Sequence, residues 1–390
     1  MKSLSYIKDL SCSDCGKLYS ADRIQTFCSD CKAPLMTNYD LLSIKHVLDR
    51  DSFSHRPKGM WRWAELLPVS DQENIVSLGE GDTPLLRLNH LGRQLQLTNL
   101  FLKEEGLNPT GSFKARGLSS AVSKAKEFGI TKLVIPSAGN AGGALAAYAA
   151  RAEMDALIYM PRSSPPSNIV ESTITGANIE LVDGLIDKAG KYAEEKATNE
   201  GWFNISTFRE PYRVEGKKIM GYEIAESLGW KLPDVIIYPT GGGTGLVGMW
   251  KAFIEMEALG WLDSRTKPRM IAVQAATCAP VVEAFAAGKL ACDFWENAHT
   301  IATGLCVPKS FADKIILKHI RESNGTAISV SDDEITQSQR RLAQSEGIFS
   351  CPEGAATVAA LDKLVKRGSV LPKETIILFN TGSGLKYISR

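Results

Sequence analysis

Short apolar runs alternate along the chain with longer stretches of helical spacing, and this alternation limits the possible folds more than any other feature. Residues 235–238, for example, follow the amphipathic stretch 216–228. The other runs are residues 100–103, 133–136, 156–160, 179–182, 270–273 and 376–379. Because near-continuous apolar strands separated by helices are typical of parallel sheets covered on both faces, the pattern predicts an α/β fold.

Three turns rich in small residues follow such runs, and each opens a predicted helix. The first reads Asn-Pro-Thr-Gly-Ser-Phe-Lys-Ala-Arg-Gly over residues 108–117, and the others cover residues 137–143 and 240–245. Free N–H groups at a helix N-terminus favour anions, so one of the last two turns can hold a phosphate and the other a carboxylate. Neither turn matches the Walker or the dinucleotide-binding pattern.

Lys114 lies just inside the helix that the first turn opens. A lysine held near apolar groups has a lowered pKa and becomes an amine nucleophile and proton carrier, as imine chemistry with an aldehyde cofactor requires. Taken alone, such a lysine is more often a solvated helix residue. Its combination with two anion-binding turns favours the catalytic interpretation.

Four cysteines near the N-terminus form two close pairs, Cys12 with Cys15 and Cys28 with Cys31. This spacing is typical of the two knuckles of a zinc ribbon, and four thiolates would complete the coordination of a structural Zn²⁺. A module that has lost its metal is the alternative. The remaining cysteines are isolated and are expected to be buried hydrophobic residues: Cys278, Cys292, Cys306 and Cys351.

Composition limits the class of protein. At 390 residues and 44% hydrophobic, the chain can bury more than one core, which predicts two lobes plus the small cysteine module. The net charge of +1 offers no field for nucleic acid or an anionic membrane. Residues 1–10 lack the apolar stretch of a signal peptide, and we expect a cytoplasmic protein. None of the five histidines lies in a motif, which argues against a histidine-based hydrolase.

Several strings together resemble the pyridoxal-phosphate (PLP) enzymes of fold type II, the tryptophan synthase β-like class, and within it the threonine synthase family. They are Gly-Glu-Gly-Asp-Thr-Pro-Leu at 79–85, residues 105–114, Ser-Ala-Gly-Asn at 137–140, the glycine loop 241–245, Pro-Glu-Gly-Ala-Ala at 352–356 and Thr-Gly-Ser-Gly-Leu-Lys at 381–386. They occur in the family's order from about residue 77 onward.

The resemblance implies a role for each matching residue. Lys114 would attach the cofactor as a Schiff base and move protons, Asn140 would bind its phenolic oxygen, and Thr381 would face its ring nitrogen. Its phosphate would be held by Gly241, Gly242, Gly243, Thr244 and Gly245. The implied reaction is a β,γ-replacement that converts O-phosphohomoserine and water into threonine and phosphate.

The same resemblance implies a substrate site. Its α-carboxylate would lie on the turn that contains Ser137, Ala138, Gly139 and Ala141. The candidates for binding its phosphate are Lys103, Arg116, Arg162 and Asn168. We expect a homodimer built from a cysteine module at 1–45, a first lobe at 46–215 with an early segment that crosses to the other lobe, and a second lobe at 216–390.

Two positions depart from the threonine synthase pattern: Ala115 replaces an aspartate and Ser383 replaces a histidine. These departures leave open a serine or threonine ammonia-lyase, or a synthase that uses O-phosphoserine. A third alternative is a catalytically silent protein that binds a partner through the cysteine module. The joint presence of Lys114, Asn140, the glycine loop and Thr381 argues against it.

Overall fold

Three sheets organise residues 3–263 and 266–388, the part of the chain that the computed structural model describes. The smallest is antiparallel with the strand order β2-β1-β3. Its strands are β1 (Ile7–Cys12), β2 (Leu18–Ser20) and β3 (Leu35–Tyr39). The segment that follows contains α1 (Leu41–Val47) and the 3-10 helices η1 (Arg50–His55), η2 (Met60–Leu66) and η3 (Gln72–Asn74).

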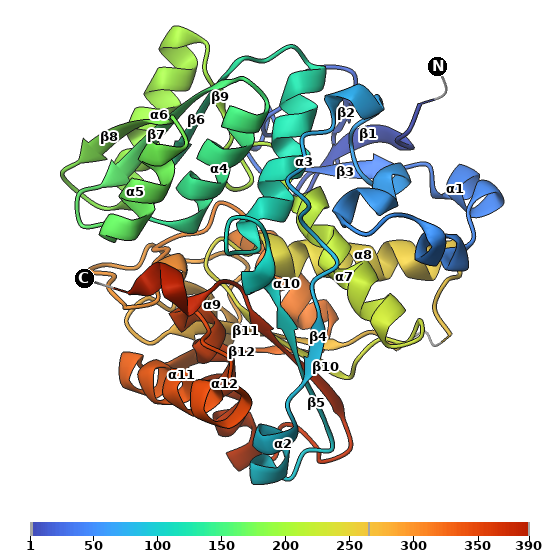
Figure 1. Ribbon diagram of the computed structural model, residues 1–390, viewed down its shortest axis with the longest axis vertical. Helices are drawn as coiled ribbons and strands as arrows, with labels where there is room; N and C mark the ends of the chain where they lie inside the picture. Colours follow the sequence, from blue (N-terminus) through green and yellow to red (C-terminus); the bar gives the residue numbers. More distant parts are fainter. Residues whose placement is uncertain (1–2, 264–265, 389–390) are drawn as a thin grey trace.

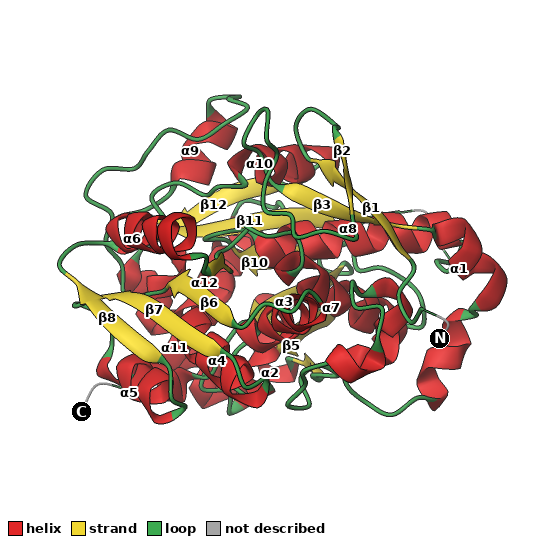
Figure 2. Ribbon diagram, turned by 90° about the horizontal axis from the view of Figure 1, so that it is seen from above, coloured by secondary structure: helices red, strands yellow, loops and turns green. Residues whose placement is uncertain are grey.

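A four-stranded parallel sheet has the order β8-β7-β6-β9. Its strands are β6 (Lys132–Pro136), β7 (Asp155–Pro161), β8 (Asn178–Val182) and β9 (Phe203–Asn204). The helices beside it are α3 (Lys114–Glu127), α4 (Asn140–Arg151), α5 (Pro166–Ile174) and α6 (Ile186–Glu200). Figure 2 shows α6 on one face of this sheet and α4 and α5 on the other. Two separate hydrophobic cores fill these two faces.

A six-stranded sheet has the order β12-β11-β10-β13-β5-β4, in which only β4 is antiparallel to its neighbour. Its strands are β4 (Leu85–Arg87), β5 (Asn99–Glu104), β10 (Val235–Pro239), β11 (Arg269–Ala275), β12 (Thr326–Val330) and β13 (Thr375–Asn380). Strands β4 and β5 therefore join a sheet whose other strands come much later in the sequence. Figure 1 shows this sheet in the lower half of the molecule, below the four-stranded sheet.

Alternate residues of β10 point into opposite cores. Ile236 and Tyr238 pack with residues of α7, α8 and α10, whereas Val235 and Ile237 pack with residues of α2, α11 and α12. The helices around this sheet are α2 (Asn89–Leu95), α7 (Arg213–Ser227), α8 (Thr244–Leu259), α9 (Pro280–Ala286), α10 (Asp313–Glu322), α11 (Asp332–Glu346) and α12 (Pro352–Lys366). The short 3-10 helices are η4 (Glu105–Leu107), η5 (Thr303–Leu305) and η6 (Gly384–Tyr387). Burial on both faces explains why this strand is apolar throughout.

These sheets confirm the α/β class expected from the sequence, and each of the seven apolar runs lies within a strand. A capping box begins α11, with Ser331 and Glu334 each bonded to the other's backbone N–H. Helices α3 and α7 pass so closely that a Cβ added at Gly216 would lie 2.0 Å from the Arg116 carbonyl oxygen. Only glycine fits at this crossing, which joins the two larger sheets.

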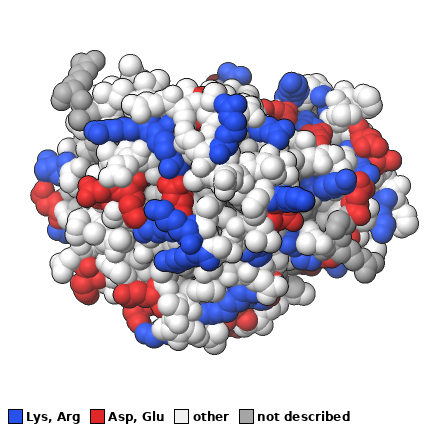
Figure 3. Space-filling view, turned by 90° about the horizontal axis from the view of Figure 1, so that it is seen from below, with Lys and Arg blue, Asp and Glu red and all other residues white. Residues whose placement is uncertain are grey.

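The surface in Figure 3 carries basic and acidic side chains interspersed with one another, as the near-zero net charge leads one to expect. Among the helices of the described residues, none has both the length and the apolar character needed to cross a bilayer.

Candidate active site

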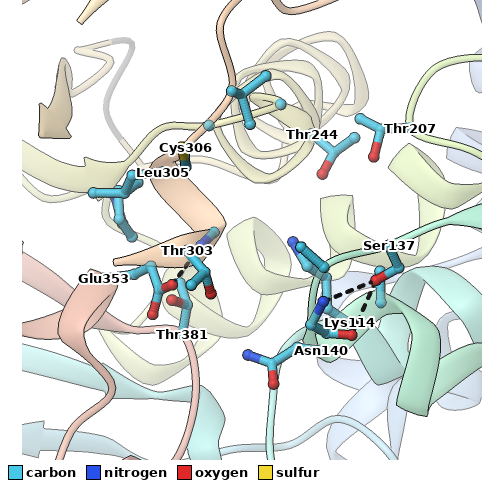
Figure 4. Close-up of a pocket in the computed structure, with 18 of the residues that line it drawn as sticks. Lys114, Ser137, Asn140, Thr207, Thr244, Thr303, Leu305, Cys306, Glu353 and Thr381 are labelled. Carbon is cyan, nitrogen blue, oxygen red and sulfur yellow. Dashed lines mark hydrogen bonds between the residues drawn. The ribbon is translucent and has the colours of Figure 1, made fainter. Parts of the chain in front are cut away.

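A pocket lies where the four-stranded and six-stranded sheets meet, at the carboxyl ends of β6 and β10. Ligands of open parallel sheets characteristically bind at such strand ends. Its walls come from Lys114, the turn at 136–141, the segment 238–245, the loop 303–307, and Glu353, Thr381 and Tyr387. Figure 4 shows Lys114, Ser137 and Asn140 on one side of this pocket and Thr303, Glu353 and Thr381 on another.

Lys114 is the first residue of α3 and lines the pocket. The preceding turn is fixed by the hydrogen bond from Phe113 N–H to Thr381 O, at 3.0 Å. The Lys114 ammonium lies 4.3 Å from the centre of the Phe113 ring. Desolvation, followed by the positive charge of Arg213, lowers the pKa of Lys114 to about 8. Roughly a tenth of its amine is therefore uncharged at pH 7, far more than for a lysine with the ordinary pKa, and the uncharged form is the nucleophile.

The glycine loop lies between the end of β10 and the start of α8, and its residues 241–245 all line the pocket. A Cβ added at Gly241 would lie 2.1 Å from Gly304 O, and one at Gly245 would lie 1.9 Å from the Tyr238 hydroxyl oxygen. The backbone thus approaches its neighbours too closely for any side chain. Because these N–H groups lie at a helix N-terminus, the loop fits a phosphate.

The second turn connects β6 to α4. Ser137 Oγ accepts hydrogen bonds from Gly142 N–H at 2.8 Å and Gly139 N–H at 3.2 Å. Asn140 begins α4 and donates from Nδ2 to the Tyr387 hydroxyl at 3.1 Å. Its Oδ1 is buried and has no hydrogen-bond partner among the described residues. An unsatisfied amide oxygen at the pocket wall indicates a site built to receive a polar molecule.

Several lining residues were not identified from the sequence as site residues. Glu353 accepts a hydrogen bond from Gly304 N–H at 2.7 Å, and its other oxygen is buried without a partner in the described structure. Glu353 lies in the quoted string at 352–356, and its acidic side chain is the feature by which it could have been identified as a site residue from the sequence. Tyr387 and the loop 303–307 carry no comparable signal because only the tertiary fold brings them to the pocket.

Two of the predicted phosphate ligands, Lys103 and Arg116, lie outside the pocket lining and are fully buried. Arg116 forms ion pairs with Glu105 at 2.6 Å and Glu223 at 2.7 Å, and Lys103 pairs with Glu223 at 2.6 Å. Their charges are already matched by carboxylates, so the expectation that they bind substrate phosphate is corrected. They connect β5, η4, α3 and α7 within the interior.

The other two phosphate candidates also lie outside the lining. Arg162 is exposed and pairs with Asp183 at 2.8 Å, so its expected role is corrected as well. Asn168 is buried beside the turn, where a Cβ on Gly139 would lie 3.2 Å from Asn168 Nδ2 and 3.8 Å from Oγ1 of the pocket residue Thr303. Its Oδ1 has no hydrogen-bond partner among the described residues, and its contribution to phosphate binding stays a prediction. By contrast, Ser137, Ala138, Gly139 and Ala141 all line the pocket.

The two departures from the threonine synthase pattern are not part of the pocket lining. Ala115 is completely buried in the core beside α4, and Ser383 accepts a hydrogen bond from Leu385 N–H at the start of η6. Their changes therefore affect packing and a helix start, whereas Lys114, Asn140, the glycine loop and Thr381 line the pocket and match the quoted strings.

Outside this pocket, the small sheet brings Cys12, Cys15, Cys28 and Cys31 together, with all four sulfur atoms within 4.8 Å of one another. Cys12 and Cys31 are 3.3 Å apart, and both Cys28 and Cys31 lie 3.7 Å from Cys15. Zn–S bonds of about 2.3 Å in a tetrahedron place sulfur atoms about 3.8 Å apart. The four thiols therefore have the number and spacing that Zn²⁺ requires.

The isolated cysteines are mostly as expected, since Cys278, Cys292 and Cys351 are buried. Cys306 differs: it is only half-buried and lines the pocket.

Comparison with known proteins agrees with the pocket chemistry. Residues 76–382 match the family model described as "Pyridoxal-phosphate dependent enzyme". The chain is 36% identical over 378 residues to the threonine synthase of Methanocaldococcus jannaschii, covering 96% of this chain and 92% of that protein. The threonine synthase of Methanosarcina acetivorans is also 36% identical, with 97% and 92% covered. Maize serine racemase, at 23% identity, shares the fold with a TM-score of 0.66 over 77% of this chain and 88% of that one.

Proposed function

The chain belongs to the threonine synthase family of pyridoxal-phosphate dependent enzymes, and we propose that it is a lyase that converts O-phosphohomoserine and water into threonine and phosphate. The observation that carries this proposal is Lys114, an amine of lowered pKa at a pocket whose other walls are an anion-binding glycine loop and a second helix N-terminus. This arrangement provides a nucleophile between two sites for negatively charged groups.

PLP would supply an electron sink that stabilises negative charge on the substrate's carbon atoms. Lys114 would hold it covalently, the backbone of residues 241–245 would bind its phosphate, and Asn140 would contact its ring. The Thr381 hydroxyl at the ring nitrogen cannot keep that nitrogen protonated as firmly as a carboxylate would. The resulting milder sink suits elimination and replacement more than transamination.

The substrate would lie with its α-carboxylate on the turn that contains Ser137, Ala138, Gly139 and Ala141, at the positive end of α4. From its place in the pocket, the Lys114 amine would remove a proton from Cα and then one from Cβ. Phosphate would then leave from Cγ with the C–O bond electrons, and a proton would be delivered to Cγ. Water would add its oxygen at Cβ while a proton returns to Cα, which gives threonine.

An ammonia-lyase of the same fold is the second candidate, because Ala115 and Ser383 differ from the threonine synthase pattern. Neither residue lines the pocket, so this argument for a changed substrate loses its basis. The structural similarity to a serine racemase concerns the fold alone.

The decisive experiment supplies O-phosphohomoserine to the PLP-loaded protein and assays phosphate, threonine and 2-oxobutyrate. We expect threonine and phosphate in equal amounts, and no product from the Lys114→Ala variant. Absence of phosphate release, together with 2-oxo acid formation from serine or threonine, would contradict the synthase proposal and establish the ammonia-lyase.

Further parts of the proposal concern the whole molecule. Cys12, Cys15, Cys28 and Cys31 would bind one structural Zn²⁺, because their four thiolates leave no coordination position for a substrate. Such thiols persist in a reducing compartment, so we assign the protein to the cytoplasm. We further propose that the protein is a homodimer that acts in threonine biosynthesis on a small amino acid. Its cysteine module and two lobes would span residues 1–45, 46–215 and 216–390.

A further inference from the structure

A second lysine, Lys217 on α7, lies behind the pocket wall and is completely buried. Its ammonium donates a hydrogen bond to Thr244 Oγ1 at 3.0 Å and lies 4.9 Å from the centre of the Phe113 ring. Thr244 is the first residue of α8 and the fourth of the five residues in the glycine loop. Lys217 therefore touches the anion-binding loop without itself lining the pocket.

The packing around Lys217 leaves room for its ammonium and little else. A Cβ added at Gly117 would lie 3.0 Å from Lys217 Cε and 3.1 Å from its Nζ. Gly117 lies three residues after Lys114, on the same side of α3, so the helix that presents the catalytic lysine also makes space for the second one.

The charges near Lys217 do not balance. Burial, followed by the positive charges of Arg213 and Lys114, lowers its pKa well below the ordinary value, and Glu210 is the carboxylate that opposes this effect. Arg213 is itself buried, and its Nε and Nη2 have no hydrogen-bond partner among the described residues. Lys217, Arg213 and Lys114 thus face Glu210, and Glu353 acts on Lys114, so the buried positive charges outnumber the carboxylates.

The adjacent residue, Lys218, shows how a buried lysine is ordinarily accommodated in this protein. It is also completely buried, but it forms ion pairs with Glu215 at 2.8 Å and Glu255 at 2.9 Å. Lys217 forms no ion pair with any carboxylate in the described structure. A burial so costly without a partner indicates that a ligand supplies the missing negative charge.

The Thr244 hydroxyl connects this charge to the pocket. An anion on the loop would favour the protonated form of Lys217, which can only donate. Lys217 then occupies a lone pair of Thr244 Oγ1 and leaves the hydroxyl hydrogen free to be donated elsewhere. The Thr244 side chain lies at the pocket wall in Figure 4. A hydroxyl polarised in this way is a stronger donor to an anion held by the loop.

We propose that Lys217 is a positioning residue for the cofactor phosphate: it places a buried positive charge behind the glycine loop and orients the Thr244 hydroxyl toward the phosphate. A phosphate monoester carries close to two negative charges at neutral pH, so it would offset the excess of buried positive charge around Lys217. The backbone N–H groups of the loop determine where the phosphate lies, and Lys217 increases the affinity for its charge.

The test compares pyridoxal 5′-phosphate with pyridoxal, which has the same aldehyde and ring but no phosphate. Both are titrated into the full-length cofactor-free protein and followed by absorbance. We expect Lys217→Met to weaken the binding of pyridoxal 5′-phosphate roughly 10- to 100-fold and to leave pyridoxal binding within about threefold of the parent. Thr244→Val should reduce the ratio of the affinity for pyridoxal 5′-phosphate to the affinity for pyridoxal. The double variant should lose no more affinity for pyridoxal 5′-phosphate than Lys217→Met alone.

Lys218→Met is the matched control, because the two lysines are adjacent and equally buried. We expect it to lower the melting temperature without changing the ratio of the two affinities. Equal losses of affinity for both ligands in Lys217→Met would leave the ratio unchanged and would overturn the proposal. If that variant does not fold, the ratio of affinities in Thr244→Val decides in the same way. The titration uses no amino-acid substrate, so its result is independent of whether the protein makes threonine.

Discussion

Replacing Arg116 by methionine should destabilise the protein strongly without changing its affinity for a phosphorylated substrate. The guanidinium is completely buried and donates five hydrogen bonds, of which four reach Glu105 and Glu223 and one reaches Thr83 Oγ1. Methionine has a similar length but leaves Glu105 buried without a cation. Removing one partner of a buried ion pair costs about 3–5 kcal/mol.

The corresponding change in melting temperature follows from the size of the chain. At about 2.1 cal/mol/K per residue, the 390 residues give an unfolding entropy of about 0.8 kcal/mol/K. A loss of about 4 kcal/mol therefore lowers the melting temperature by about 5 °C. Because Glu105 is the group left without a partner, the double variant Arg116→Met with Glu105→Gln should recover part of this loss.

Thermal unfolding followed by circular dichroism measures the effect, and phosphate release measures the KM for O-phosphohomoserine. Arg162→Met is the control, because Arg162 pairs with Asp183 on the surface and we expect no measurable change in melting temperature. If Arg116→Met melted like the parent and raised the KM at least tenfold, Arg116 would be a substrate ligand and the structural reasoning would be refuted.

Three further predictions concern the pocket and the cysteine module. Lys114→Ala should abolish turnover while the melting temperature stays near that of the parent; residual activity within about tenfold would contradict its catalytic role. Because only the uncharged amine attacks an aldehyde, the rate of pyridoxal attachment to Lys114 should rise up to about pH 8 and level off above it, and a profile that is flat from about pH 6 to pH 9 would exclude this pKa. Cys28→Ser should lose bound zinc, measured by elemental analysis, and melt at a lower temperature, whereas Cys292→Ser, which lies outside the cluster, should keep its zinc.

The parts of the fold and site that could be predicted from the sequence depend on local patterns. A strand such as β10 is recognisable because burial on both faces requires five consecutive apolar residues. The turns at 137–143 and 240–245 are recognisable because an anion-binding helix N-terminus needs small residues in sequence. For the same reason, the cysteine pairs indicate their cluster, since each knuckle is a short local turn.

The parts that could not be predicted depend on partners far away in the sequence. Lys103 and Arg116 have the residue types of phosphate ligands, but their carboxylate partner Glu223 lies 120 and 107 residues away. Nothing local distinguishes such a buried ion pair from a free cation. Tyr387 reaches Asn140 across 247 residues, and Lys217 meets Thr244 across 27 residues between two helices.

The position of β13 in the six-stranded sheet has a consequence for how the protein is synthesised. This strand, Thr375–Asn380, lies between β10 and β5, whose residues leave the ribosome long before it. Until β13 emerges, β4 and β5 have no strand through which to join β10, and their unpaired edge stays exposed. We therefore expect the six-stranded sheet to form only after β13 has been synthesised, with the nascent N-terminal strands depending on chaperones until then.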